Sequence, residues 1–154
     1  MKKLLALVAV TLTAGALAIT LSGRPRNNRP DRFVGAWKLV SLEEPGTDGN
    51  VHKADCTGLL VYTSDGHMSV QVMYRNPQPS AKAAPVQYSQ GGYEASFGRY
   101  EIDNPHTFTF HVEGALVRSL IGKDLKRVYE FSGNQLIVKS PDPSEHWRVA
   151  WERY

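Results

Sequence analysis

The sequence predicts an all-β protein: a single eight-stranded antiparallel up-and-down barrel, preceded by an N-terminal hydrophobic segment. From residue 33 onward, short segments rich in β-branched and aromatic residues alternate between apolar and polar positions. Turn signals separate these segments about every ten residues. No stretch repeats apolar residues at helical spacing over three turns. Eight strands joined by short turns close most economically as a barrel, because closure leaves no exposed sheet edge.

Residues 1–23 have the layout of a signal peptide or an N-terminal membrane anchor. Lys2 and Lys3 precede an uncharged run at residues 4–21, and Ala16-Leu17-Ala18 supplies a small-residue cleavage site. The run is also close to the roughly 17–25 residues that span a bilayer. We therefore expect an exported protein, periplasmic or extracellular. The alternative is a protein anchored in the membrane through residues 4–21, which would be its only membrane contact.

Residues 24–31 read as a flexible basic linker, and the barrel domain is expected at residues 32–154. The formal net charge of +3 is unevenly distributed. The first 32 residues hold six of the 18 Lys and Arg residues and one of the 15 acids, which leaves twelve against fourteen in the remainder, a formal −2. The predicted barrel is slightly acidic and has no basic cluster interleaved with aromatic residues. Nucleic-acid binding is therefore not expected.

The predicted strands cover residues 33–43, 58–63, 67–74, 93–102, 107–115, 126–131, 135–140 and 147–153. The second and third flank Ser64-Asp65-Gly66, and Asp-Gly between two alternating runs is a strong hairpin signal. Residues 45–50, Asn104-Pro105, residues 132–134 and residues 141–143 supply further turns. Residues 116–125 could form one short helical turn. The connection at residues 75–92 is long and proline-rich, and is either a lid over the barrel or a surface excursion.

Several segments, taken together and in order, resemble the bacterial and fungal lipocalin-like domain family. The resemblance covers nearly all of residues 33–154, and it rests on Gly35-Ala36-Trp37, Leu39-Val40-Ser41, residues 58–63, residues 65–70, residues 97–100, residues 111–114 and Trp151-Glu152-Arg153. It implies a lipocalin-like calyx for a small organic molecule. It also implies a structural role for Trp37, which would close the barrel base beneath Arg153 in a cation–π contact.

His111 and Glu113 are the candidate catalytic residues. They lie two apart in a predicted strand and therefore share a face with Thr107 and Thr109, whereas Phe108 and its alternate neighbours share the other. If the polar face points inward, His111 could transfer protons with Glu113 orienting it. If it points outward, the pair is a solvated surface, which is the commoner arrangement in strands with one wet face.

The candidate ligand-binding residues are Tyr62, His67, Tyr100, Arg127 and Tyr129. The three tyrosines have hydroxyl groups that can orient a ligand, although tyrosine also favours strands for structural reasons. His67 either lines the cavity mouth or stabilises the hairpin turn. An inward Arg127 would need a partner, either an acidic side chain or an anionic ligand.

No metal site and no cofactor are expected. The five histidines are scattered without the close spacing of zinc ligands, and no phosphate loop or nucleophile elbow is present. Cys56 is the single cysteine, so the chain has no internal disulfide. We expect it to be a small half-buried apolar residue, with a reactive thiol as the alternative.

Three functions remain open from the sequence. The first is an exported lipocalin-like protein that binds a small apolar or amphipathic molecule inside the barrel, so its partner is a small organic ligand. The second is a cofactor-independent isomerase, cyclase or hydratase that uses His111 with Glu113. The third is a structural envelope protein whose barrel is filled by its own side chains. The sequence favours a binding protein over an enzyme.

Overall fold

A computed structural model describes residues 32–46, 48–76 and 92–154. The predicted leader, the linker at 24–31 and most of the 75–92 connection lie outside these residues. No helix in the described ranges is both long enough and apolar enough to cross a membrane. The elements of the described residues are β1 (Gly35–Pro45), β2 (Val51–Lys53), β3 (Cys56–Tyr62), β4 (His67–Tyr74), β5 (Tyr93–Asn104), β6 (Thr107–Ala115), the 3₁₀ turn η2 (Arg118–Leu120), β7 (Asp124–Ser132), β8 (Gln135–Lys139) and β9 (Arg148–Arg153).

The sheet closes on itself because β1 pairs with both β3 and β9. From β3 to β9, each strand pairs antiparallel with the next one in the sequence. The predicted eight-stranded antiparallel barrel is therefore confirmed. The short strand β2 is an addition, which pairs with the last three residues of β1. Alternation could not predict β2, because all three of its residues are exposed.

The strand bounds agree with the sequence pattern to within two residues. The segments predicted at 67–74 and 107–115 have the bounds of β4 and β6. The last strand begins at Arg148, and Trp147 precedes it. The backbone N–H of Trp147 donates to the carbonyl of Glu145 inside the β8–β9 connection, so Trp147 belongs to that turn. The predicted short helical turn is η2.

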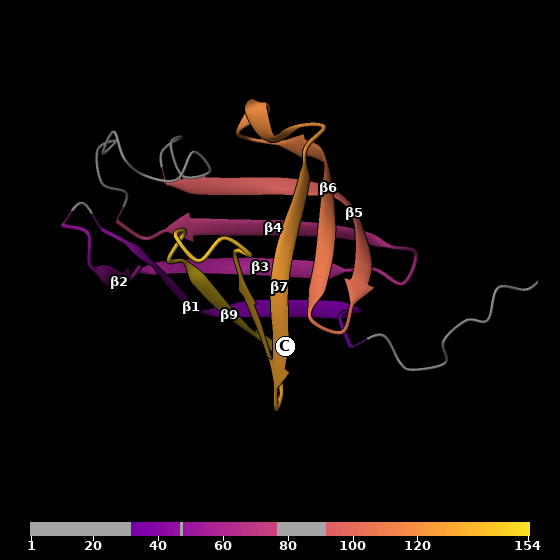
Figure 1. The fold of residues 1–154 in the computed structure, drawn as a ribbon, viewed down its shortest axis with the longest axis horizontal. Coiled ribbons are helices and arrows are strands. Elements are labelled where there is room, and N and C mark those ends of the chain that lie inside the picture. The colour runs from indigo at the N-terminus through magenta and orange to yellow at the C-terminus, as the bar shows by residue number, and fades with distance from the viewer. Residues whose placement is uncertain (1–31, 47, 77–91) are drawn as a thin grey trace, which may run out of the picture. The chain divides into compact units, whose positions relative to one another are not determined.

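β5 bends sharply, and this bend lets the sheet fold over itself. In Figure 1, β3 and β4 run across the view, whereas β6 and β7 stand upright. The pairing of β5 with β6 shifts register between Phe97 and Gly98, which marks a bulge. A Cβ atom at Gly98 would lie 2.0 Å from the backbone oxygen of His111, so only glycine allows this approach.

An aromatic cluster fills one end of the barrel, which we call the base. The ring centroid of Phe33 lies 4.8–5.6 Å from those of four other rings, belonging to Tyr62, Phe108, Tyr129 and Phe131. The Arg153 guanidinium lies 4.5 Å from the ring centroid of Trp37 and donates to the carbonyls of Val34 at 2.8 Å and Arg32 at 2.6 Å. These are the geometries of a cation–π contact and two hydrogen bonds, and they join the last strand to the segment before β1.

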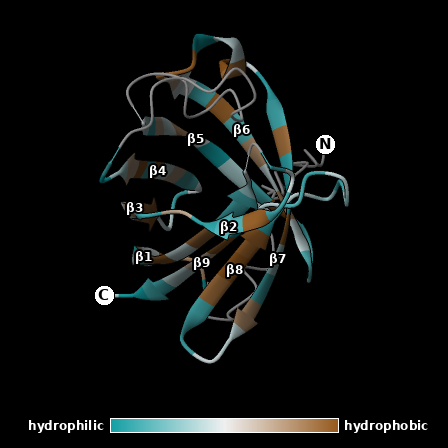
Figure 2. Ribbon diagram, turned by 90° about the vertical axis from the view of Figure 1, so that its left-hand side faces the viewer, coloured by the Kyte–Doolittle hydropathy of each residue, from teal (hydrophilic) through white to brown (hydrophobic). Residues whose placement is uncertain are grey.

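β8 is the most continuously buried strand of the aliphatic core, with Leu136, Ile137 and Val138 all buried. Figure 2 shows β8 as an almost continuous hydrophobic ribbon. Leu136 and Val138 belong to the buried cluster of the barrel interior, together with Leu60, Val72 and Trp151. The interior is therefore apolar over most of its wall.

Candidate functional site

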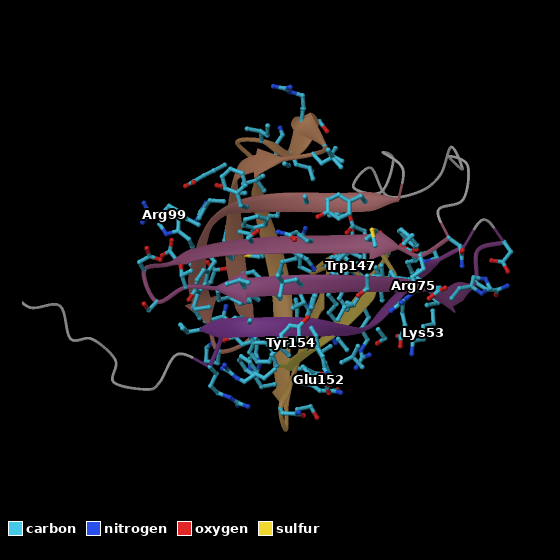
Figure 3. The ribbon with its side chains drawn as sticks, turned by 180° about the vertical axis from the view of Figure 1, so that it is seen from behind. Lys53, Arg75, Arg99, Trp147, Glu152 and Tyr154 are labelled. Atoms are coloured by element: carbon cyan, nitrogen blue, oxygen red, sulfur yellow. The ribbon has the colours of Figure 1, made fainter. Side chains whose placement is uncertain are left out.

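The barrel contains a partly open cavity of about 100 Å³ between the aromatic base and the opposite end, which we call the mouth. Most of its wall is apolar or aromatic, formed by side chains that include Leu60, Val72, Phe108, Phe110, Val138 and Trp151. These residues come from five strands, and each lies on the inward face of its strand. In Figure 3, Arg75 lies at the mouth end of the barrel and Arg99 at the base end.

β5 contributes the polar part of this wall. Its inward residues Glu94 and Ser96 are 7% and 6% exposed, and both line the cavity. Its outward residues include Phe97, which is 55% exposed and whose ring covers Gly114 of β6. The N-terminal half of β5 is thus inverted, with polar side chains inside the barrel and the Phe97 ring outside.

The Glu94 carboxyl group is buried without full compensation. Its Oε2 atom is buried and has no hydrogen-bond partner among the described residues. Burial raises the pKa of Glu94, and a hydrogen bond with Ser96 offsets part of this rise. A carboxyl group in such a position can accept a hydrogen bond from a ligand or pair with a ligand cation.

Arg127 and Trp147 form a second polar element at the mouth. Both line the cavity, and the guanidinium carbon of Arg127 lies 5.2 Å from the ring centroid of Trp147. Arg127 also donates to the carbonyl of Lys126 at 3.0 Å, and the Trp147 indole N–H donates to Glu145 at 3.0 Å. Trp147 is half-buried and lies in the connection before β9. A movement of its side chain would therefore not disrupt the strand pairing.

Two of the predicted ligand-binding residues, Tyr62 and Arg127, line the cavity. Tyr100 and Tyr129 lie in the aromatic base instead, where their hydroxyls donate to the carbonyls of Thr63 at 3.3 Å and Asn104 at 3.2 Å. His67 is exposed next to the β3–β4 turn, where its Nδ1 lies 3.1 Å from Asp65. The structure therefore brings only two of the five predicted residues to the cavity.

The predicted catalytic residues His111 and Glu113 point away from the cavity. Phe108, Phe110 and Val112 are the buried side chains of β6, so the residues between them face outward. The Nδ1 atom of His111 lies 2.7 Å from Asp124, and its Nε2 atom lies 3.9 Å from Glu101. Glu113 is exposed. The outward alternative is the observed one, because the aromatic face of β6 is required by the core.

Cys56 is half-buried near the mouth, and its Sγ lies 3.7 Å from the carbonyl oxygen of Ala54. Burial, with smaller contributions from Glu44 and Asp55, raises the pKa of its thiol to about 11. A thiol with such a pKa is largely protonated at neutral pH and reacts slowly, which favours the apolar interpretation. Nearby, the Tyr74 hydroxyl donates to Glu44, whose pKa is raised by burial.

Sequence reasoning missed Glu94, Ser96 and Trp147. Alternation in residues 93–102 does place Glu94 and Ser96 on one face, but hydropathy assigns that face to the outside. No group of three or more metal-ligating side chains occurs in the part of the chain that the structure describes. The cavity lining thus includes the carboxyl of Glu94, the hydroxyls of Ser96 and Tyr62, the guanidinium of Arg127 and the indole of Trp147.

Comparison with known proteins supports the family resemblance. Curated protein sequences give no match. Among solved structures, the chain is similar to an uncharacterised protein from Bacteroides eggerthii, with 13% identity, coverage of 79% of this chain and 99% of that chain, and a TM-score of 0.47. It is also similar to a redesigned β-barrel, with 13% identity, coverage of 80% and 92%, and a TM-score of 0.44. A family model described as a lipocalin-like domain matches residues 34–153, and the chain therefore belongs to the lipocalin-like domain family.

Proposed function

We propose that the barrel binds a small organic molecule whose apolar part occupies the cavity. The observation that carries this proposal is a cavity of about 100 Å³ in a barrel core that is otherwise filled by side chains. Apolar walls with a few placed polar groups are typical of ligand sites. The same observation argues against a barrel filled entirely by its own side chains.

The volume limits the ligand. A dry cavity of about 150 Å³ holds benzene or xenon, so about 100 Å³ suits xenon or a molecule of four or five heavy atoms. A larger ligand must displace a side chain that lines the cavity. We expect this side chain to be Trp147, because it is half-buried and lies outside the strands. With a ceiling of about 1.5 kcal/mol per heavy atom, a five-atom ligand would bind with micromolar affinity at best.

Xenon is the sharpest probe of this proposal, because it needs space and no polar group. Under xenon pressure, the methyl NMR signals of Val72 and Val138 should shift with saturation. Val138→Leu adds a methylene group to the cavity wall and should weaken this shift, whereas Val40→Leu, at an exposed site, should leave it unchanged. Methyl shifts that do not saturate with xenon pressure, and that are equal in the wild type and both variants, would contradict a hollow barrel.

We also propose that the protein is exported, periplasmic or extracellular, with membrane anchoring through residues 4–21 as the alternative. The support is the sequence pattern alone: two lysines, an uncharged run and Ala16-Leu17-Ala18. The intact mass of the protein from its native host tests this. Loss of residues 1–18 is expected, and retention of Met1 to Ala18 would support the anchor.

The alternative of a reaction that uses His111 with Glu113 gains no support from the barrel cavity, because neither side chain lines it and both face outward on β6. His111 already pairs with Asp124 there.

A further inference from the structure

The inverted face of β5 points to the chemistry of the ligand, and this inference rests on the proposed function. Glu94 is more than nine-tenths buried, and its Oε2 atom is without a hydrogen-bond partner in the described residues. A barrel core gains nothing in stability from such a group, because an unpaired buried carboxylate is costly. A ligand that pairs with the carboxylate would give Glu94 a role.

The groups that face Glu94 from the neighbouring elements do not neutralise it. Its register partner on β4 is Val72, and the hydroxyl of Tyr74 on β4 donates to Glu44. On β6, Val112 is buried and Ala115, the register partner of Ser96, packs against the core; both side chains are apolar. No ion pair within 4.0 Å joins Glu94 to a basic side chain of the described ranges.

Arg127 is the other charged side chain that lines the cavity in the described part of the chain. Its guanidinium stacks on Trp147 and donates to a backbone carbonyl. It is only half-buried, so water screens its charge more than that of Glu94. The deepest charge in the cavity is therefore the carboxylate.

We propose that the cavity binds a small aliphatic amine, with its ammonium group hydrogen-bonded to the Glu94 carboxylate and its hydrocarbon part against the apolar wall. An ammonium group satisfies Oε2 through a charge-assisted hydrogen bond. Phe110, Trp147 and Trp151 also line the cavity, and a ring within about 6 Å of the ammonium group would add cation–π attraction. An anionic ligand would be repelled by the buried carboxylate of Glu94.

Three probes with the same branched carbon skeleton test the proposal: isobutylamine, isobutanol and the slightly larger isobutyrate, titrated at pH 7.5 and followed by methyl NMR. Isobutylamine should bind about ten-fold more tightly than isobutanol, because a charged hydrogen bond replaces a neutral one. Isobutyrate should not bind. In the wild type, amine affinity should fall as the pH is lowered through the pKa of Glu94, while isobutanol affinity should stay constant.

Glu94→Gln keeps the shape and removes the charge. It should abolish the preference for the amine and leave isobutanol affinity within about two-fold. The matched control is Glu130→Gln, an exposed carboxylate of β7, which should keep the wild-type preference.

Equal affinity for amine and alcohol in the wild type would overturn the proposal. So would tight binding of isobutyrate that is lost in Arg127→Met, which would assign the site to Arg127. If xenon binds and isobutylamine does not, the amine proposal fails while the proposed function stands. If xenon also fails to bind, the proposed function itself is wrong.

Discussion

Glu94 is buried more deeply than any other charged side chain in the described residues. Burial raises the pKa of Glu94, so the folded protein holds this proton more tightly than the unfolded chain. The folded state is therefore penalised once the pH is high enough to ionise the group. The penalty is absent below the pKa of the unfolded chain, grows as the pH rises and is complete above the raised pKa of the folded state.

We expect Glu94→Gln to stabilise the protein at pH 8 by about 1–3 kcal/mol, because the neutral amide removes the cost of ionising a buried carboxyl group. The gain should shrink as the pH falls towards the ordinary pKa of a glutamate. Urea unfolding of the wild type and the variant at a series of pH values measures this difference. The pH-dependent contribution of Glu44 to stability cancels, because both proteins contain that residue. A gain that is the same at every pH would show that Glu94 is not destabilised by its charge.

β5 shows how one strand serves both the fold and the site. Its N-terminal half presents Glu94 and Ser96 to the cavity, and its C-terminal half turns the corner at Gly98. The bulge between Phe97 and Gly98 re-aims the strand, as bulges do at barrel corners. The bend and the polar wall therefore depend on the same element.

Gly98→Ala should destabilise the protein by at least about 2 kcal/mol, because the new Cβ would meet the backbone oxygen of His111 and neither backbone can move freely. The comparison is Gly122→Ala, where a Cβ meets no atom within 4 Å and only the positive φ of 78° is unfavourable. That change should cost about 1 kcal/mol. Denaturant unfolding of both variants measures the two costs; a Gly98 variant no less stable than the Gly122 variant would contradict a crowded corner.

The whole barrel is held shut at its base by contacts between its first and last segments. β1 and β9 pair through six residues of each strand, and Arg153 adds its contacts with Trp37 and two backbone carbonyls. Arg32 lies over Phe131, at 4.2 Å from the ring centroid, on the same end. The base is thus closed, and ligand access is expected through the mouth.

Arg153→Met keeps the aliphatic part of the side chain and removes the charge and both hydrogen bonds. We expect a loss of about 2 kcal/mol in the free energy of unfolding, from the cation–π contact and the two carbonyl acceptors left without their donor. The control is Arg118→Met in η2, at an exposed position, which should change stability by less than about 0.5 kcal/mol. Urea unfolding with an unchanged m-value would measure both; equal effects of the two changes would argue against a sealing role for Arg153.

The sequence by itself determined every strand of the described residues except β2, together with the turns and the barrel fold, because alternation and turn chemistry can be recognised in the sequence. It also showed that His111 and Phe108 lie on opposite faces of one strand. It could not decide which face of a strand points inward where hydropathy misleads, as at Glu94 and Phe97. That choice belongs to the tertiary structure, because strand pairing and the bend at Gly98 orient β5 whatever its own hydropathy. The position of Trp147 was also decided by the tertiary structure, because Trp147 lies in the β8–β9 connection and not in a strand, so alternation could not show that it lines the cavity.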